Sequence, residues 1–279
     1  MDLRPDPAEI EQIKDAERAW HDAMYLEHAP GAYPQSPEEF RARFIRNHLT
    51  PFCDGGWSWW ADARCNALAA MGDVRGLRVL DYGCGYGGLG MFLALRGAEV
   101  WGFDLSRPAV EVANRTAVVY DVAAQFAEMD AGDLAYADDF FDLVVGFGVL
   151  HHVIKYPRAG SELLRVVKPG GRAVFHETLW DNPLINFARR FTTEHADAGD
   201  VHLTDCGIRE FCSGFREVTL EKLYLLYMLK RLAALPAHDL AAGLEPRPFW
   251  RAVKAADRAL LVLPPLRRYC GEVNIYLTK

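Results

Sequence analysis

The sequence has no run of uncharged apolar residues as long as the ~18 residues that a membrane-spanning helix needs. Its first residues, Met1–Pro7, contain neither the basic region nor the apolar region of a secretory signal peptide. No cluster of lysine and arginine stands out, and the formal net charge is −7. We therefore expect no membrane anchor, no export, and no nucleic acid as the main partner.

Cysteine is scarce, with 6 residues in a chain of 279. No two of them form a C-x-x-C pair, and Cys206 and Cys212 are too far apart for the usual zinc spacing. The acidic residues show no clear set for a metal site either, so no metal is expected. A chain of this length needs no disulfide framework, and a reducing cytosol is the expected location.

The composition is that of a globular protein, with 51% hydrophobic and 25% charged residues. Three regions differ in pattern. Residues 1–75 read as helical, and Ser36–Glu39 has the cap, proline and glutamate of a helix start before Phe40 and Phe44. Residues 76–177 alternate strands with helices, and residues 178–279 are less regular.

The middle region predicts an α/β fold. Strands are expected at Arg78–Asp81, Glu99–Asp104, Gln125–Asp130, Phe141–Phe147 and Arg172–His176. Helices are expected at Leu89–Leu95, after the cap residue Ser106, and at Ser161–Val167, with a turn at Lys168–Gly171. Strands that alternate with helices indicate a parallel sheet with right-handed crossovers.

The last region predicts two more strands and two helices. The strands are Arg216–Leu220 and Glu272–Thr278, and in the second of these Val273, Ile275 and Leu277 point inward. The helices are Leu223–Leu235 and Phe249–Leu263, and Pro264–Pro265 is expected to end the second helix.

A glycine-rich loop is the first chemical signal. Gly83, Gly85 and Gly88 follow a strand, open a helix and satisfy G-x-G-x-x-G. Asp104 ends the next strand, where a carboxylate can accept hydrogen bonds from both hydroxyls of a ribose. These features alone fit a nicotinamide-dependent oxidoreductase as well as a protein that binds S-adenosylmethionine.

Further motifs separate these alternatives. They are Val79–Gly85, Gly102–Ser106, Met129–Leu134, Phe140–Val145, Gly148–His152 and Leu163–Gly171. In order and spacing, residues 77–177 resemble the class I S-adenosylmethionine-dependent methyltransferases. The resemblance is closest to the small-molecule group that includes the ubiquinone and menaquinone C-methyltransferases.

This resemblance implies a Rossmann-like, doubly wound sheet of seven strands, with the last strand, Glu272–Thr278, antiparallel. Residues 1–75 would form a helical N-terminal lid on a methyltransferase domain at 76–279. That domain would carry a lid insertion at about 178–215 and a helical insertion at about 221–271. The implied activity is methyl transfer from S-adenosylmethionine to a small molecule of secondary or cofactor metabolism. A protein that uses the same cofactor for another reaction remains the alternative.

The resemblance also assigns cofactor-binding residues. Asp81 and the backbone of Gly83, Cys84 and Gly85 would hold the methionine half, and Asp104 would hold the ribose. Asp130 would accept the adenine amino group, although an acid after a strand is also a common turn residue. The remaining predicted contacts come from Leu105, Met129, Ala131 and the carbonyl group of Phe147.

Catalysis of methyl transfer needs alignment, exclusion of water and, for some acceptors, removal of a proton. Ligands bind at the carboxyl ends of strands in such sheets, where His151 and His152 follow one strand and His176 and Glu177 end another. We predict His151 as the first candidate base and His176 as the second, because an imidazole suits proton transfer near neutral pH. Positions matching these two face the active site in cyclopropane-forming relatives. The alternative is that the histidines cap or pack.

The acceptor itself is not identified by the sequence. Tyr25, Tyr33, Trp57, Trp59 and Trp60 could form an aromatic lid, and Leu179–Phe215 could supply an opposite wall, but such residues often only pack. Carbon, oxygen and nitrogen acceptors all remain open.

Overall fold

The computed structural model describes residues 7–28, 36–50, 60–179, 182–183, 201–228 and 247–279. A seven-stranded sheet has the order β3-β2-β1-β4-β5-β7-β6. The strands are β1 (Arg78–Tyr82), β2 (Glu99–Asp104), β3 (Ala124–Glu128), β4 (Phe141–Phe147), β5 (Val167–Thr178), β6 (Glu217–Leu223) and β7 (Glu272–Thr278). Strand β7 runs antiparallel to both of its neighbours, and the other neighbouring strands are parallel. The predicted Rossmann-like sheet with an antiparallel last strand is confirmed.

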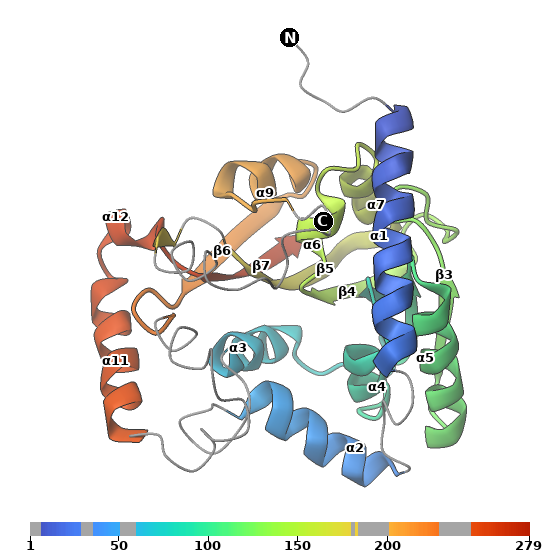
Figure 1. Cartoon of the computed structure of the whole chain (residues 1–279), viewed down its shortest axis with the longest axis horizontal. Coiled ribbons are helices and arrows are strands. Elements are labelled where there is room, and N and C mark those ends of the chain that lie inside the picture. Colours follow the sequence, from blue (N-terminus) through green and yellow to red (C-terminus); the bar gives the residue numbers. More distant parts are fainter. Residues whose placement is uncertain (1–6, 29–35, 51–59, 180–181, 184–200, 229–246) are drawn as a thin grey trace.

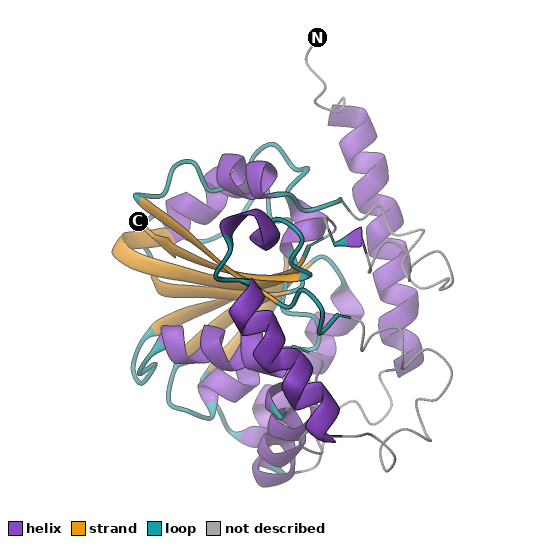
Figure 2. Cartoon of the chain, turned by 90° about the vertical axis from the view of Figure 1, so that its left-hand side faces the viewer, coloured by secondary structure: helices purple, strands orange, loops and turns teal. Residues whose placement is uncertain are grey.

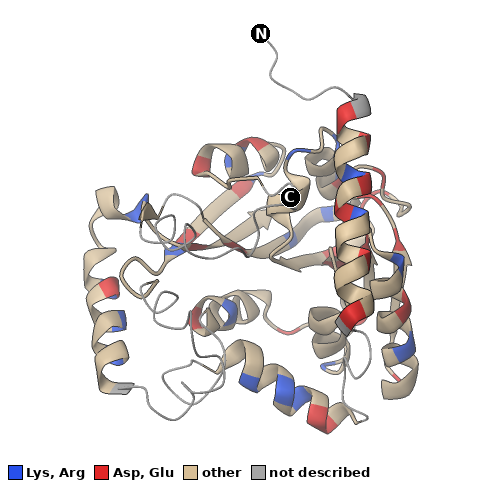
Figure 3. Ribbon diagram, viewed as in Figure 1, with Lys and Arg blue, Asp and Glu red and all other residues tan. Residues whose placement is uncertain are grey.

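Helices cover both faces of this sheet (Figures 1 and 2). They are α1 (Pro7–His28), α2 (Pro37–Phe44), the π-helix η1 (Ile45–Leu49), α3 (Ala61–Met71), α4 (Gly88–Ala94), α5 (Arg107–Tyr120), α6 (Leu150–Val153), α7 (Ala159–Val166), α9 (Asp205–Phe211), α11 (Arg247–Leu260) and α12 (Pro264–Arg267). Helices α3, α4 and α5 lie on one face, and α6, α7 and α9 lie on the other (Figure 1). Figure 3 shows that α1 carries charges of both signs along its length.

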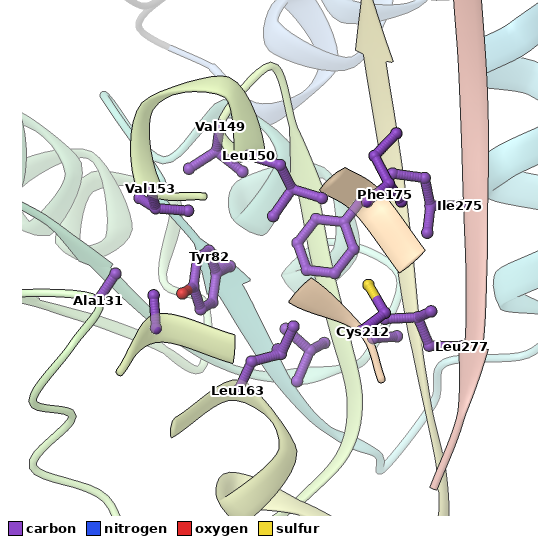
Figure 4. Packing of buried hydrophobic residues seen from close by; sticks show 14 of the residues in the cluster. Tyr82, Ala131, Val149, Leu150, Val153, Leu163, Phe175, Cys212, Ile275 and Leu277 are labelled. Atoms are coloured by element: carbon purple, nitrogen blue, oxygen red, sulfur yellow. The ribbon is translucent and has the colours of Figure 1, made fainter. Parts of the chain in front are cut away.

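Two hydrophobic cores lie on the two faces of the sheet, because side chains alternate along each strand. Leu80 and Val144 point into one core, and Val79, Leu143 and Val145 point into the other. All of these side chains are buried, as expected for parallel strands that are covered on both faces. Figure 4 shows the first core, where Tyr82, Val149 and Val153 lie together. This packing fixes the loops that follow β1 and β4.

The two helix starts predicted from local sequence are confirmed. The Ser36 hydroxyl oxygen accepts a hydrogen bond of 3.2 Å from the backbone nitrogen of Glu39. Ser106 caps α5 in the same way through Ala109, at 3.5 Å. Each cap satisfies a helix amide that would otherwise lack a partner.

Strand and helix ends differ from the sequence prediction in the second half of the chain. Leu223 is the last residue of β6, and residues 224–228 are not helical, so the predicted start of a helix at Leu223 is wrong. Pairing with β7 extends β6 to this residue, where Leu223 lies opposite Glu272. Residues 229–235 lie outside the described part of the chain. Helix α11 ends at Leu260, three residues before the predicted end, and Pro264 opens α12.

The other differences are small. Strand β3 ends at Glu128, so Asp130 lies in the following loop. The predicted turn at Lys168–Gly171 lies inside β5: Phe141 pairs with Val167, and Leu143 pairs with Arg172. The intervening residues of β5 therefore bulge out of the ladder.

Candidate active site

A cavity of about 100 Å³ lies at the carboxyl ends of β1, β2 and β4 and beside the loop after β3. Six predicted cofactor residues line it: Gly83, Asp104, Leu105, Met129, Asp130 and Ala131. Its other lining residues are Glu17, His21, Tyr25, Phe103, Gly148, Val149, His152, Val153 and Tyr156. The strand order reverses between β1 and β4, so the cavity lies at the point where open α/β sheets bind their ligands.

The glycine loop contributes Gly83 to the wall of this cavity. Gly83 has φ +64°, and a Cβ at this position would lie 2.2 Å from a methyl carbon of Val149. Gly85 has φ +51°, and a Cβ there would lie 2.7 Å from the hydroxyl oxygen of Tyr25. Both positions therefore favour glycine for backbone conformation, and Gly83 also needs it for space, whereas the contact at Gly85 is with the end of a flexible tyrosine side chain. The loop can approach a ligand through its backbone alone.

Asp104 is fixed at the rim of the cavity by the backbone. Its Oδ2 accepts a hydrogen bond of 2.8 Å from the nitrogen of Gly85, and its Oδ1 accepts one of 3.0 Å from the nitrogen of Ser106. Burial raises the pKa of Asp104, and these backbone bonds oppose that rise. A carboxylate has about four acceptor sites, so two bonds leave capacity for both hydroxyls of a ribose.

Asp130 combines the two roles that the sequence left open. Its Oδ1 accepts a hydrogen bond of 2.7 Å from the nitrogen of Gly132, which is the contact of a turn residue. Its side chain also lines the cavity, and its Oδ2 forms an ion pair with Lys14 of α1. An amino group that enters the cavity would therefore compete with Lys14 for this carboxylate.

The other predicted cofactor residues do not line the cavity. Asp81 is buried and accepts a hydrogen bond of 2.8 Å from the nitrogen of Gly90 in α4, and burial raises its pKa to about 7. Cys84 is buried, and its nitrogen donates to the carbonyl oxygen of Phe103. Gly85 belongs to the glycine loop, and the ring of Phe147 lies 5.7 Å from that of His176.

Helix α1 supplies Glu17 and His21, two lining residues that the sequence reasoning missed, beside Tyr25 of the predicted aromatic lid. Glu17, His21 and Tyr25 line the cavity, and Lys14 reaches Asp130 from the same helix. Residues spaced by three and four positions lie on one face of a helix, so a polar stripe was the available signal. Ligand pockets usually have volumes of ~300–1,000 Å³, which is larger than the cavity of about 100 Å³ that remains beneath α1.

Glu17 anchors α1 to the segment that follows β4. It accepts hydrogen bonds from Lys155 Nζ at 2.5 Å and from the hydroxyl group of Tyr156. His152 Nδ1 lies 3.6 Å from the same carboxylate. Burial alone would raise the pKa of Glu17, but these partners outweigh burial and lower it.

The two predicted bases, His151 and His176, lie outside the cavity lining and pair with buried carboxylates. His151 Nδ1 lies 2.8 Å from Glu177 Oε2. The other oxygen of Glu177 accepts hydrogen bonds of 2.7 Å from the nitrogens of both Val149 and Leu150. Burial would raise the pKa of Glu177, but His151 and the two backbone donors lower it. An ionised Glu177 favours the tautomer of His151 with the proton on Nδ1, which makes Nε2 the basic nitrogen.

His176 lies on the opposite side of β5 from Glu177. It is almost fully buried, and its Nε2 lies 3.3 Å from Glu272 Oε2. The structure therefore separates the two predicted bases: His151 is 21% exposed in its side chain and His176 only 4%. His151 is the more accessible of the two.

Comparison with known proteins agrees with this architecture. Residues 80–175 match a family model described as a methyltransferase domain. A ubiquinone biosynthesis O-methyltransferase of Alkalilimnicola ehrlichii is 40% identical over 156 residues, which cover 50% of this chain and 63% of that protein. A demethylmenaquinone methyltransferase of Clavibacter sepedonicus is 36% identical over 167 residues, with coverage of 59% and 64%. The matches thus span slightly less than two thirds of these relatives.

Two solved structures show the same fold. Phosphoethanolamine N-methyltransferase 2 of Haemonchus contortus, solved with S-adenosyl-L-methionine, has a TM-score of 0.57 at 20% identity, with coverage of 86% of this chain and 56% of that chain. The cyclase SpnF has a TM-score of 0.54 at 22% identity, with coverage of 80% and 82%. These two structures show the fold alone, and the family model identifies residues 80–175 as a methyltransferase domain.

Within the described residues, no helix is long and apolar enough to cross a membrane. The same part of the chain contains no group of three or more His, Cys, Asp or Glu residues placed to hold a metal ion.

Proposed function

We propose that this protein transfers a methyl group from S-adenosylmethionine to a small, partly apolar molecule. The observation that carries the proposal is the convergence of Gly83, Asp104, Met129 and Asp130 on one cavity at the switch point of the sheet. Glycines that a Cβ would obstruct and a carboxylate with spare acceptor capacity are suited to an adenosyl ligand. The names of the curated relatives support an acceptor of the quinone-precursor type.

The cofactor would lie across the carboxyl ends of β1 to β4. Asp104 would accept hydrogen bonds from the ribose hydroxyls, and Asp130 one from the adenine amino group. Met129 and Leu105 would contact the faces of the adenine ring, and the glycine loop with Phe147 would hold the amino acid end. When bound, the cofactor supplies an activated methyl group on sulfur.

The chain itself must exclude water and manage protons. We propose that His151 removes the proton of the acceptor through Nε2 and that Glu177 is a positioning residue. Glu177 is held by two backbone donors and is fully buried, so it fixes the imidazole ring and stabilises the charge that the ring gains. An acceptor that ionises on its own, such as an acidic phenol, would need only to be aligned with the methyl group of the cofactor.

The N-terminal helices are proposed as a lid over this site. Helix α1 contributes Glu17, His21 and Tyr25 to the cavity, and Trp60 precedes α3 near the end of β4. Tyr33, Trp57, Trp59 and residues 180–181 and 184–200 of the second predicted lid lie outside the described part of the chain. The insertion at about 221–271 is likewise described only in part.

Calorimetry and a transfer assay test the proposal. S-adenosylhomocysteine should bind and NAD(H) should not, and labelled methyl should pass from the cofactor to an acceptor in a panel of phenols, quinols and fatty acids. Binding of NAD(H) alone would replace the proposal with an oxidoreductase. Binding of S-adenosylmethionine with conversion of an acceptor but no methyl transfer would favour a cofactor-bound enzyme of another reaction class.

A further inference from the structure

A second and larger cavity lies between α3, β6 and α11, with a volume of about 520 Å³. This volume falls within the range of ~300–1,000 Å³ that is usual for small-molecule pockets. None of its lining residues lines the candidate active-site cavity described above. Figure 1 shows α11 and α1 at opposite ends of the sheet. The second cavity is therefore a separate feature of the molecule.

The strand register gives the separation of the two cavities. Glu221 of β6 lines the second cavity and lies opposite Asn274 of β7. Asn274 lies opposite His176, and His176 lies opposite Phe147 at the end of β4. Three strand spacings of ~4.8 Å place Glu221 about 14 Å from Phe147. A small ligand in the second cavity would therefore not reach a methyl group at the end of β4.

Polar contacts hold the walls of this second cavity together. Asp62 of α3 forms an ion pair of 2.5 Å with Lys254 of α11. Asn66 of α3 donates a hydrogen bond of 2.7 Å to Glu221. All four side chains line the cavity, so α3 is tied to both of the other walls. These contacts are those of a preformed pocket rather than of a loose gap between helices.

Asp257 of α11 fixes the segment that follows β6. Its carboxylate accepts hydrogen bonds from the backbone nitrogens of residues 225, 226 and 227, at 3.0, 2.6 and 3.0 Å. The preceding residue, Tyr224, lines the cavity with φ +60°, which is unusual for a bulky side chain. The hydroxyl oxygen of Tyr224 accepts a hydrogen bond of 3.2 Å from the nitrogen of Ala63 in α3. This part of the wall is therefore held from two sides.

Two of the cations that line the cavity have no acidic partner. The lysines, Lys222 and Lys254, each form an ion pair with an aspartate. Among the described residues, no carboxylate lies within the 4.0 Å of an ion pair with Arg258 or Arg267. Arg267 donates from Nε to the carbonyl oxygen of Leu261 at 2.8 Å. Its terminal nitrogens, and the whole guanidinium group of Arg258, remain available to a ligand.

The acidic lining residues, in contrast, all have donors. Asp62 has Lys254, and Asp257 has three backbone nitrogens. Glu221 accepts hydrogen bonds from three side chains. The two arginines are therefore the charges for which the cavity provides no counterion, and an anionic ligand would supply one.

We propose that this cavity binds a small organic acid, whose oxyanion group contacts Arg258 and Arg267 and whose apolar part lies against Leu261 and Val262. All four of these residues line the cavity. The fork of N–H donors of a guanidinium group matches the oxygens of a carboxylate or a phosphate group. Because the two cavities share no residue, the acid binds independently of the cofactor, and the proposal does not rest on the proposed function.

Ligand-detected NMR at fixed ionic strength tests this proposal with benzoate, phenyl phosphate and neutral benzamide as probes. At least one of the two acids should bind the parent protein, and the tighter one identifies the oxyanion. Benzamide should bind at least about 3-fold more weakly than that acid, and saturating S-adenosylhomocysteine should not change the affinity of the acid.

Arg258→Met and Arg267→Met should each weaken the acid about 3- to 10-fold, a modest loss because both side chains are exposed and screened by solvent. Arg268→Met is the matched control: Arg268 is exposed, changes the net charge equally and does not line the cavity. Arg258 and Arg267 also lie in the last turns of α11 and α12, where a cation stabilises a helix. The measurement is therefore the affinity for the acid and not the stability of the fold. Arg258→Lys keeps the charge and should show a smaller loss than Arg258→Met.

Parent-like affinity in both Arg258→Met and Arg267→Met would overturn the proposal, and so would an equal loss in Arg268→Met. Binding of benzamide as tight as that of the acids would show an apolar crevice without an anion site. Failure of both acids to bind the parent protein, or their displacement by S-adenosylhomocysteine, would overturn it as well. Failure of S-adenosylhomocysteine itself to bind would count against the proposed function alone.

Discussion

Lys14 occupies a contact that the proposed cofactor would use. It extends from α1 to Asp130, the residue proposed to accept the adenine amino group, and forms an ion pair with it. Lys14 lies against this carboxylate beside a cavity of only about 100 Å³, so we expect cofactor binding to displace its ammonium group. Lys14→Met keeps an apolar side chain and removes the competing charge. We therefore expect S-adenosylhomocysteine to bind more tightly to this variant than to the parent protein.

The size of the effect follows from the burial of the pair. The side chain of Lys14 is 10% exposed and that of Asp130 is 27% exposed, so solvent screens the pair only in part. Exposed ion pairs contribute up to about 1 kcal/mol, and charge-assisted hydrogen bonds contribute about 1.5–3 kcal/mol. An intermediate value of about 1–2 kcal/mol corresponds to roughly 5- to 30-fold tighter binding.

Titration calorimetry at fixed ionic strength measures this change. Lys168→Met is the control, because it makes the same substitution in another lysine–aspartate pair, with Asp142 near the start of β4. It changes the net charge equally and lies at the opposite edge of the sheet. Unchanged or weaker binding in Lys14→Met, with unchanged binding in Lys168→Met, would refute the idea that Lys14 competes with the cofactor.

Three further predictions concern the site and its charges. Asp104→Ala should weaken S-adenosylhomocysteine by about 10²–10⁴-fold in calorimetry, because two charge-assisted hydrogen bonds of about 1.5–3 kcal/mol each are lost; parent-like affinity in a folded variant would show that the ribose assignment is wrong. His151→Ala should lower turnover by about 10²–10⁴-fold and remove the acidic limb of the pH–rate profile while leaving cofactor affinity unchanged, and Glu177→Gln should change the same profile by a smaller factor; parent-like profiles in both would leave alignment as the only contribution. Burial raises the pKa of Asp81 to about 7, so the folded state favours the protonated form, and stability is lost as the pH rises from about 4 through 7. The stability of Asp81→Asn relative to the parent protein should therefore be greater at pH 8 than at pH 4.5, by up to about 4 kcal/mol in chemical denaturation. An equal difference in stability at both pH values would contradict the buried, protonated carboxyl.

Local patterns in the sequence predicted most strands of the sheet and the caps of two helices. The apolar run of β4 and the alternation of β7 are visible in any short window, and Ser36 and Ser106 cap helices through neighbours three residues away. Local patterns failed where distant pairing decides the structure. Leu223 joins β6 because β7 continues opposite it, and nothing near Leu223 in the sequence carries that information.

The candidate site divides in the same way. Gly83 and Asp130 follow strands, and Asp104 ends one. Parallel strands bring their carboxyl ends to one edge, so the convergence of these residues could be predicted. A lid at residues 1–75 that includes Tyr25 was also predicted, but the contributions of Glu17 and His21 could not be, because more than 60 residues separate them from the glycine loop. The docking of helix α1 could not be predicted, because it depends on the whole polar face of the helix rather than on a motif.

The charges at this edge of the sheet suggest how docking of α1 and ligand binding are connected. Asp104 is satisfied by backbone amides, which stay in place whether or not a ligand binds. Asp130 accepts from the nitrogen of Gly132 as well, but its other oxygen is paired with Lys14, a side chain of α1. A ligand whose amino group binds Asp130 would therefore compete with α1, whereas its ribose would meet an Asp104 that is already in place. Under the proposed function, Asp130 is thus the point at which docking of α1 and cofactor binding oppose each other.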